Sequence, residues 1–420
     1  MLLAATSNSD IGVVVGVVAM ISAAYLLTHF VVDRVQQRFL VVSGVEYLVL
    51  GALLGPGFPL VSAFEDLSPL LPFIALAAGW VGLLRGTDFD IAMLRRTETG
   101  TARIVILHHL TPGLLVAFAA YYALLSGQIG IVSETEAIIC ACFLGCCAAA
   151  DSSEPFDLLS SRYEITGKLS NTLKHATKMG DILVVIVFGL IFCFFRDAPD
   201  QATEAIAATR TADGAVWSWI MFALGAGLGV LFLPIVGGDD SESSRLLALA
   251  GVITFASGAA YFLKLSPLAV NLILGIVLVN TARDGHLVHA TLESTGKPMS
   301  IVLLIFAGAL WRPVAWAPTL VGAVAFITLR IVGKMIGSVL NSWGTQYRSD
   351  LFRGLLAHGD VTVAMAVSFH VVYGGLASDL AYSVVLCSIV FHDLIGPRAL
   401  RGLLVDQGDI QHELPQATQG

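Results

Sequence analysis

The chain has 420 residues, of which 56% are hydrophobic and only 13% are charged. A soluble domain carries about 25% charged residues, and a water-soluble chain of this length could not bury so much apolar surface. Composition therefore excludes a soluble globular protein and predicts an integral membrane protein. The formal net charge of −8 indicates no particular partner, because charges on a membrane protein are sorted by side of the bilayer.

Apolar stretches bounded by short polar connectors follow one another along the sequence, as expected for helices that span a bilayer. Alternating segments of about ten residues, typical of outer-membrane barrels, are absent from the sequence. Residues 1–10 lack the basic start of a cleavable signal, so the first stretch is expected to be a genuine helix. We predict thirteen transmembrane helices, near residues 11–32, 40–55, 67–84, 104–125, 135–160, 179–195, 215–236, 246–263, 267–281, 298–311, 318–341, 353–374 and 381–397.

The basic residues predict the orientation of the chain. With the N-terminus outside, only four of the 23 lysines and arginines fall in outer connectors: Arg196, Arg210, Lys264 and Arg312. Arg330 and Lys334 lie within a span, and the other 17 fall in cytoplasmic connectors. The positive-inside rule then predicts a multi-pass protein of the cell (inner) membrane with an outer N-terminus and a cytoplasmic C-terminus.

Thirteen helices divide into six, a linker helix at 215–236 and six more. Corresponding helices are then seven apart and run in opposite directions. Many secondary transporters are built from such inverted repeats, and their substrate sites lie near the bilayer midplane, where interrupted helices meet. The predicted fold class is therefore an all-α polytopic membrane protein with two inverted six-helix repeats.

Polar residues interrupt the fifth and the twelfth predicted spans at corresponding places. The twelfth carries His358, Gly359 and Asp360, and the fifth carries Asp151, Ser152, Ser153, Glu154 and Pro155. Breaks of this kind are tolerated in a membrane only where the freed backbone groups line a cavity or an ion. The alternative, a loop between two separate helices, is disfavoured because the flanking apolar pieces are too short to cross alone. We therefore predict two broken helices.

Asp181 precedes the apolar stretch 182–190 of the sixth span. A carboxylate inside a membrane is costly and is by default a candidate functional site. If this helix starts near residue 174, Asp181 lies about 10 Å inside it. The alternative is an aspartate that caps the helix or lies in its first turn, where the helix dipole favours it.

Arg330, Lys334 and Ser338 recur every four residues within the eleventh span and form one polar stripe on a helix. A lone lysine can extend to the membrane surface, whereas a whole stripe facing lipid would be costly. We therefore expect the stripe to face the protein interior.

Taken together, these features resemble the monovalent cation:proton antiporter superfamily, which includes sodium/proton exchangers and potassium efflux antiporters. The order and spacing of several segments carry the similarity, namely 48–56, 78–83, 178–183, 266–280, 333–337 and 354–361. The resemblance implies a dimerisation domain and a moving core domain, with two broken helices crossing near the ion site. It implies a dimerisation domain at 1–100 and 238–312, a core domain at 101–200 and 313–400, a linker helix at 201–237 and a short polar tail at 401–420.

The resemblance also implies roles for individual residues. Asp181 would bind the monovalent cation or the proton, with support from Asp151, Ser152 and Ser153. Charge-compensating or structural roles would fall to Lys334, Arg330, Glu154, Asp360 and His358.

The chain departs from the family at three places. Gly180 stands where the family has Asn, Asp or Gln, so Lys334 lacks its expected carboxylate at position 180. His358 replaces a common arginine, and the run at 151–155 is more acidic than usual. These departures leave the identity of the cation open.

One carboxylate can hold a proton or a cation but not both. Burial can raise the pKa of a carboxyl group from about 3.9 by as much as about 3–5 units, into the range where protons exchange near neutrality. Alternating exposure of Asp181 would then give one-for-one, electroneutral exchange of Na⁺ or K⁺ for H⁺, with no cofactor. The sequence thus predicts a secondary transporter and not an enzyme.

Two alternatives stay open, an antiporter-like channel or sensor subunit and an intramembrane aspartyl protease that uses Asp181 and Asp360 as its acid and base. The protease alternative lacks the tyrosine expected before the first aspartate. His108 and His109, and the six cysteines, provide no complete zinc ligand set.

Expected partners are membrane lipids and a second copy in a homodimer, with no nucleic acid. The tail from Asp406 is too short for a nucleotide-binding domain, so any regulation of that kind would need a cytoplasmic regulatory subunit.

Overall fold

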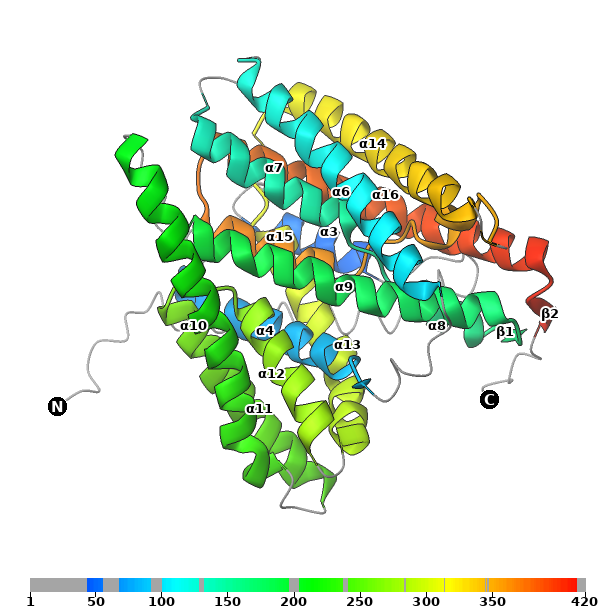
Figure 1. Ribbon diagram of the computed structural model, residues 1–420, viewed down its shortest axis with the longest axis horizontal. Helices are drawn as coiled ribbons and strands as arrows, with labels where there is room; N and C mark the ends of the chain where they lie inside the picture. Colours follow the sequence, from blue (N-terminus) through cyan, green and yellow to red (C-terminus); the bar gives the residue numbers. More distant parts are fainter. Residues whose placement is uncertain are drawn as a thin grey trace.

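The protein is described here from a computed structural model (Figure 1). It describes residues 44–55, 68–91, 100–127, 132–195, 204–236, 241–282, 285–312, 314–343, 345 and 347–413. The first predicted span, 11–32, and most of the acidic connector that precedes Glu242 lie outside the described residues.

The first half of the described chain consists of helices α3 (Val45–Leu54), η2 (Ser68–Leu70), α4 (Leu71–Thr87), α6 (Thr101–Leu125), α7 (Glu134–Ala149), α8 (Glu154–Ser160) and α9 (Lys168–Phe194), with strand β1 (Tyr163–Ile165) before α9. Local chemistry explains several helix starts. A proline lies in the first turn of α4 and of α8, where its missing N–H is not needed. The Ser133 hydroxyl accepts a hydrogen bond from the Glu136 N–H and so caps α7.

The second half consists of α10 (Glu204–Val236), α11 (Glu242–Phe262), α12 (Pro267–Thr281), α13 (Gly285–Ala309), α14 (Trp316–Ser342), η3 (Leu351–Gly354), α15 (Asp360–Val372), α16 (Leu376–Gln407) and strand β2 (Ile410–Glu413). Strand β2 pairs antiparallel with β1, and Tyr163 lies opposite Glu413. The segment predicted as a polar tail therefore continues α16 as far as Gln407 and then adds a strand.

The predicted all-α polytopic fold is confirmed. Within the described residues, every predicted span from the second to the thirteenth coincides with a helix or, for the fifth and twelfth, with helical pieces around a break. Seven of these helices are long and apolar enough to cross a membrane. Several boundaries are wrong: the sixth, seventh and tenth helices are predicted to start at 179, 215 and 298, whereas α9 begins at Lys168, α10 at Glu204 and α13 at Gly285. The thirteenth is predicted to end at 397, whereas α16 ends at Gln407. Hydropathy does not detect the first three turns of α9 because they are polar.

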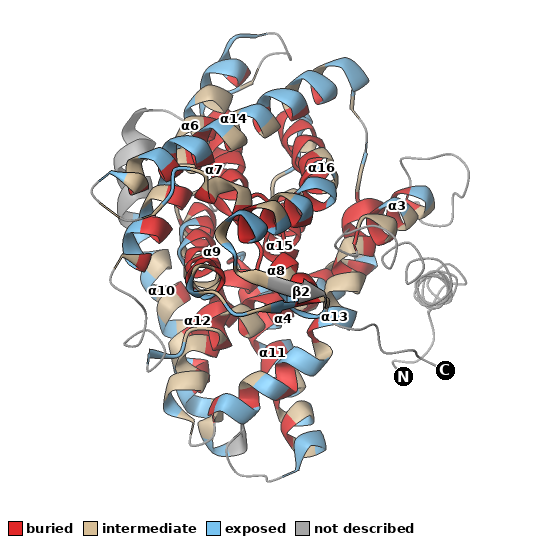
Figure 2. Cartoon of the chain, turned by 90° about the vertical axis from the view of Figure 1, so that its right-hand side faces the viewer, coloured by how far each residue is buried: buried red, intermediate tan, exposed pale blue. Residues whose placement is uncertain are grey.

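The helices form two bundles (Figure 1). In one, which we call the α6 bundle, α6 packs on α7, α9 and α14, and α16 packs on α7, α14 and α15. In the other, the α4 bundle, α4 packs on α11, α12 and α13, and α13 packs on α3. Helix α10 contacts α9, α11 and α12, so it touches both bundles. Figure 2 shows that α9 and α15, the helices of the α6 bundle that contact α4, are largely buried.

Helix contacts occur in corresponding pairs. Helix α3 packs on α13 as α12 packs on α4, and α6 packs on α9 as α14 packs on α16. The counterparts are predicted spans that are seven apart, namely α3 and α12, α4 and α13, α6 and α14, and α9 and α16. This correspondence agrees with the predicted inverted repeat, which stays a prediction, as does the division into dimerisation and core domains.

The outer faces of the long helices are apolar. Leu114 and Phe118 on α6, and Val321 and Val324 on α14, are among the exposed large hydrophobic residues. In water such faces would be strongly unfavourable, whereas lipid chains can solvate them. The chain is therefore a multi-pass membrane protein whose polar residues gather inside.

Candidate functional site

The two broken helices meet inside the protein. Helix α7 ends at Ala149 and α8 begins at Glu154, while α15 begins at Asp360 after the non-helical residues 355–359. A Cβ atom on Gly359 would lie only 2.7 Å from the Ser152 hydroxyl oxygen. Glycine thus allows the two breaks to touch, and the predicted pair of broken helices is present.

Asp181 lies in the middle of α9, beside the first of these breaks. It is thirteen residues after Lys168, which is about 20 Å along the helix, and only 2% of it is exposed. The alternative of a capping or first-turn aspartate is therefore wrong. The free backbone N–H of Asp151 donates a hydrogen bond of 3.3 Å to Asp181 Oδ1. The break in α7–α8 thus supplies a backbone donor to the carboxylate on α9.

Asp151 is the carboxylate that pairs with Lys334. Lys334 Nζ lies 2.5 Å from Asp151 Oδ1, and Arg330 Nη2 lies 3.5 Å from the same oxygen. Arg330, Lys334 and Ser338 are all fully buried, so the predicted inward orientation of the polar stripe is confirmed. The carboxylate that the sequence lacks at position 180 is therefore replaced from the neighbouring broken helix.

Arg330 connects the two breaks through backbone carbonyls. Its guanidinium donates to the carbonyls of Ala148 at 3.1 Å and Ala150 at 2.8 Å, and to the carbonyl of Leu356. Helix ends leave such carbonyls without intrahelical partners, which is costly where water is excluded. Arg330 satisfies carbonyls of both interrupted helices at once and therefore has a structural role.

The two predicted serines lie at the site, but they accept hydrogen bonds from the backbone of the adjacent helix α8. The Ser152 hydroxyl accepts a hydrogen bond of 3.2 Å from the Glu154 N–H at the start of α8. Ser153 is buried, and its carbonyl accepts from the Phe156 N–H. In the part of the chain that the structure describes, neither hydroxyl is hydrogen-bonded to Asp181.

Asp181 differs from Asp151 in having no cationic partner. Among the described residues, no Lys, Arg or His nitrogen lies within 4.0 Å of its carboxylate, and its hydrogen bond comes from a neutral backbone N–H. The two nearest buried cations of α14, Arg330 and Lys334, are both directed to Asp151. We call Asp151, Asp181, Arg330, Lys334 and His109 the break cluster.

A second group of charges, the Arg85 cluster, joins the two bundles. Arg85 at the end of α4 lies 2.6 Å from Asp360 Oδ1 on α15 and 4.0 Å from Glu154 on α8. Asp88, just after α4, accepts from Lys178 on α9 at 2.5 Å. Burial favours the neutral form of Asp88, but Lys178 and Arg85 together outweigh it and hold the pKa of Asp88 below its ordinary value. The carboxylates Asp88 and Asp360 are thus both ion-paired.

These contacts bear on the protease alternative. Two catalytic aspartates must share a proton or a water molecule. Asp360 instead accepts from Arg85 and Ser300, while Asp181 accepts from the Asp151 backbone. The geometry gives the protease alternative no support.

His358 connects α15 to α16. Its Nε2 lies 3.0 Å from the Ser388 hydroxyl and its Nδ1 lies 3.2 Å from the Thr362 hydroxyl. Its ring packs edge-on against His392. Within the described residues His358 makes no ion pair, so its place in the fold is structural.

His109 is a site residue that the sequence did not indicate. Its ring comes from α6, and its Nε2 lies 3.4 Å from Asp151 Oδ2. A Cβ atom on Gly180 would lie 1.8 Å from this same Nε2. The ring therefore occupies the space that a side chain at position 180 would need. The combination of a histidine in an apolar span and a glycine beside Asp181 was the only available signal.

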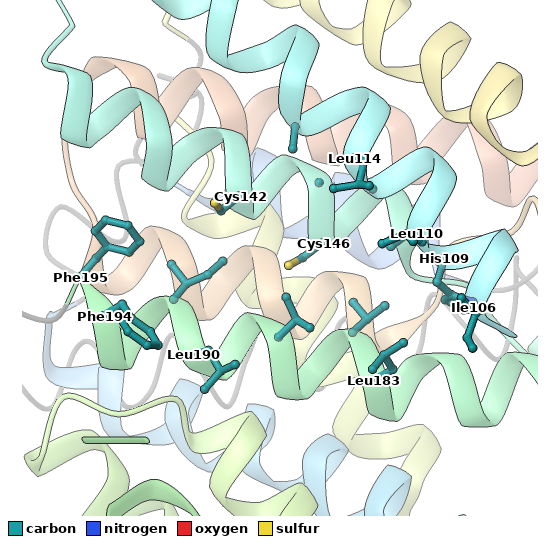
Figure 3. A pocket seen from close by; sticks show the side chains of 17 residues that line it. Ile106, His109, Leu110, Leu114, Cys142, Cys146, Leu183, Leu190, Phe194 and Phe195 are labelled. Atoms are coloured by element: carbon teal, nitrogen blue, oxygen red, sulfur yellow. The ribbon is translucent and has the colours of Figure 1, made fainter. Parts of the chain in front are cut away.

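An apolar pocket of about 450 Å³, partly open to the outer surface, lies between α6, α7 and α9. Figure 3 shows His109 and Ile106 at one end and Phe194 and Phe195 at the other. Its lining is almost entirely apolar, apart from His109. The ring of His109 thus stands between this pocket and Asp151.

The fold is similar to that of solved structures of a sodium/proton antiporter. The structure of the sodium/proton antiporter MjNhaP1 from Methanocaldococcus jannaschii at pH 8 matches with a TM-score of 0.66 and 14% identity, covering 92% of this chain and 98% of the antiporter. The electron-microscopy structure of the same antiporter matches with a TM-score of 0.61 and 14% identity, covering 93% and 96%. No protein-family model and no curated protein sequence matches the chain.

The likeness extends over nearly the whole length of both proteins, and at this identity it establishes the fold. The chain therefore has the fold of a sodium/proton antiporter. The resemblance inferred from the order and spacing of the sequence segments is confirmed at that level.

Proposed function

We propose that the protein is a secondary transporter that exchanges a monovalent cation for a proton, and that both bind at Asp181. The observation that carries this proposal is the unequal pairing of the two buried aspartates. Lys334 and Arg330 both contact Asp151, whereas Asp181 is left with one neutral donor. Arg85 and Lys334 act on Asp181 only from a distance, and a buried carboxylate with no cation in contact is strongly unfavourable, so we expect a proton or a transported cation to neutralise it.

Competition at one carboxylate couples the two fluxes. A proton on Asp181 removes the charge that attracts a cation, and a bound cation raises the cost of adding a proton. The site therefore holds one or the other. One unpaired carboxylate supports one-for-one, electroneutral exchange.

Exchange also requires that the site open to each side in turn. The ion pairs Arg85–Asp360 and Asp88–Lys178 join α4 of one bundle to α15 and α9 of the other. Arg85, Asp88 and Lys178 lie toward the predicted cytoplasmic side. We infer that these pairs separate when the α6 bundle moves relative to the α4 bundle and exposes Asp181 to that side.

The name of the structural neighbour, a sodium/proton antiporter, supports Na⁺ as a cargo, and the sequence leaves K⁺ open as well. We also propose the orientation given by the basic connectors, the inner membrane, and a homodimer. The antiporter fold is that of a transporter, so we expect no enzymatic activity.

The proposal is tested with the purified full-length protein in liposomes that contain a pH-sensitive dye. An outward gradient of NaCl or KCl should drive proton uptake, and the rate should be the same with and without an imposed membrane potential. A proton flux that needs no cation, or a cation current that needs no proton, would overturn exchange and favour the channel alternative. Lack of flux with any alkali chloride would overturn the proposed function altogether.

A further inference from the structure

We propose that His109 is the second side chain of the cation site and determines which cation the site selects. This inference rests on the proposed function, because it concerns the same site. In this proposal a side chain of α6 contacts the bound cation or a water molecule bound to that cation. The observations that carry the proposal are the space His109 fills, its hydrogen bonding and its place between Asp151 and the apolar pocket.

The first observation is steric. A Cβ atom at position 180 would lie 1.8 Å from Nε2 and 2.0 Å from Cε1 of His109. Both atoms belong to a rigid ring whose other nitrogen is fixed, so the ring cannot move aside cheaply. Position 180 and His109 therefore compete for one volume, one residue before Asp181 on α9. The polar group in that volume comes from α6 and faces Asp151, whose backbone N–H donates to Asp181.

The second observation concerns the orientation of the ring. His109 Nδ1 lies 2.7 Å from the Val105 carbonyl oxygen, which can only accept, so Nδ1 carries the proton. In the neutral ring Nε2 then presents a lone pair toward Asp151 Oδ2, 3.4 Å away. Both atoms are buried, and neither has a hydrogen-bond partner in the described structure.

Two buried acceptors that face each other without a donor call for an electropositive ligand. Lys334 does not serve this purpose, because it contacts the other oxygen of Asp151. The ligand that the proposed function supplies is the monovalent cation, or an O–H of its bound water. A neutral ring adds no charge to the break cluster, so His109 contributes to affinity and selectivity without altering the charge that Asp181 exchanges.

The third observation is the position of the His109 ring, which lines the apolar pocket and also faces Asp151. On the far side of the ring lies the apolar pocket between α6, α7 and α9 (Figure 3). A smaller residue at position 109 would open the space beside Asp151 to that outer pocket. Truncation should therefore weaken selection by size as well as affinity.

The test exchanges the two positions. His109→Ala should raise the apparent KM for the cation about tenfold and reduce the preference among Li⁺, Na⁺ and K⁺, with kcat changed about twofold or less. Gly180→Asn alone should lower exchange about tenfold or more, because its side chain overlaps the ring. The double variant His109→Ala/Gly180→Asn should recover to within about threefold of wild type, because an amide from α9 then fills the same volume.

His109→Gln keeps a polar group at this position and should fall between wild type and His109→Ala in KM. His370→Gln is the matched control, since His370 is a histidine of α15 whose ion-pair partner is Asp379, outside the break cluster. It should leave KM and selectivity unchanged. Thermal stability of each variant in detergent separates loss of fold from loss of binding.

Unchanged KM and selectivity in folded His109→Ala would overturn the inference, and so would Gly180→Asn exchanging as fast as the double variant. If His109→Ala does not fold, the KM and selectivity of His109→Gln decide alone. The proposed function fails separately, through absence of exchange in the wild type or full exchange by Asp181→Asn.

Discussion

The break cluster and the Arg85 cluster contain the same kinds of side chain but pair them differently. In the Arg85 cluster, Asp88 and Asp360 each have a cationic partner, at 2.5 and 2.6 Å. In the break cluster, Asp151 attracts both cations of α14 and leaves Asp181 unpaired. A paired carboxylate holds helices together, whereas an unpaired buried one is available to a transported ion. Ion pairing of the carboxylates, and not their burial alone, therefore distinguishes the structural Arg85 cluster from the proposed ion site.

The largest expected effect is on Asp181. Asp181→Asn keeps the size of the side chain and removes the exchangeable charge, so cation-driven proton uptake in liposomes should fall by about two orders of magnitude or more. Asp379→Asn, which alters a carboxylate at the start of α16, is the control and should retain exchange. A variant Asp181→Asn with wild-type flux would make the unpaired carboxylate irrelevant.

Substitutions of Asp151 and Asp181 should differ in their effects on folding stability. Asp151→Asn leaves Lys334 buried without a counter-charge, so we expect a loss of about 3–5 kcal/mol of folding stability. Asp181→Asn removes an unpaired buried charge and should leave stability unchanged or increase it. Thermal melting in one detergent compares the two. Equal destabilisation by both substitutions would contradict the difference in pairing.

The Arg85 cluster should show a smaller effect that depends on pH. Because the pKa of Asp88 is lowered in the folded protein, the contribution of this group is present above its unfolded pKa of about 3.9 and is lost as the pH falls through the folded value. The stability difference between wild type and Asp88→Asn should therefore be constant near neutrality and shrink below about pH 4. A difference that grows on acidification would have the wrong sign. Melting curves from pH 3 to pH 7 provide the measurement.

The smallest effect is expected for an exposed ion pair. Lys174 lies 2.5 Å from Asp157, and the two side chains are 33% and 58% exposed. Such pairs contribute about 0–1 kcal/mol, so Lys174→Ala should change neither stability nor exchange measurably. A large effect of Lys174→Ala on exchange would contradict the minor role expected of an exposed pair.

Much of the fold could be predicted from the sequence because hydropathy marks each spanning helix directly. The polar interruptions at Asp151 and Asp360 also signalled the two breaks, since only a lined site tolerates them in a membrane. The start of α9 at Lys168 could not be predicted in this way, because its first turns are polar and are stabilised by packing inside the protein.

The pairing within the site could not be predicted. Asp151 and Lys334 are 183 positions apart, and only the crossing of the broken helices brings them together. The sequence predicted Asp151 beside the ion and left Lys334 without a carboxylate at position 180, but it did not indicate that Asp151 itself pairs with Lys334. His109 was considered only as a metal ligand, because nothing in one sequence indicates that its ring fills the space above Gly180.

Proton release on cation binding tests the central claim most directly. Purified protein in a weakly buffered detergent solution is mixed with NaCl or KCl, and the released protons are counted with a dye. The account predicts about one proton per chain from the wild type and none from Asp181→Asn, because cation and proton compete for the same carboxylate. Equal release from both proteins would contradict it.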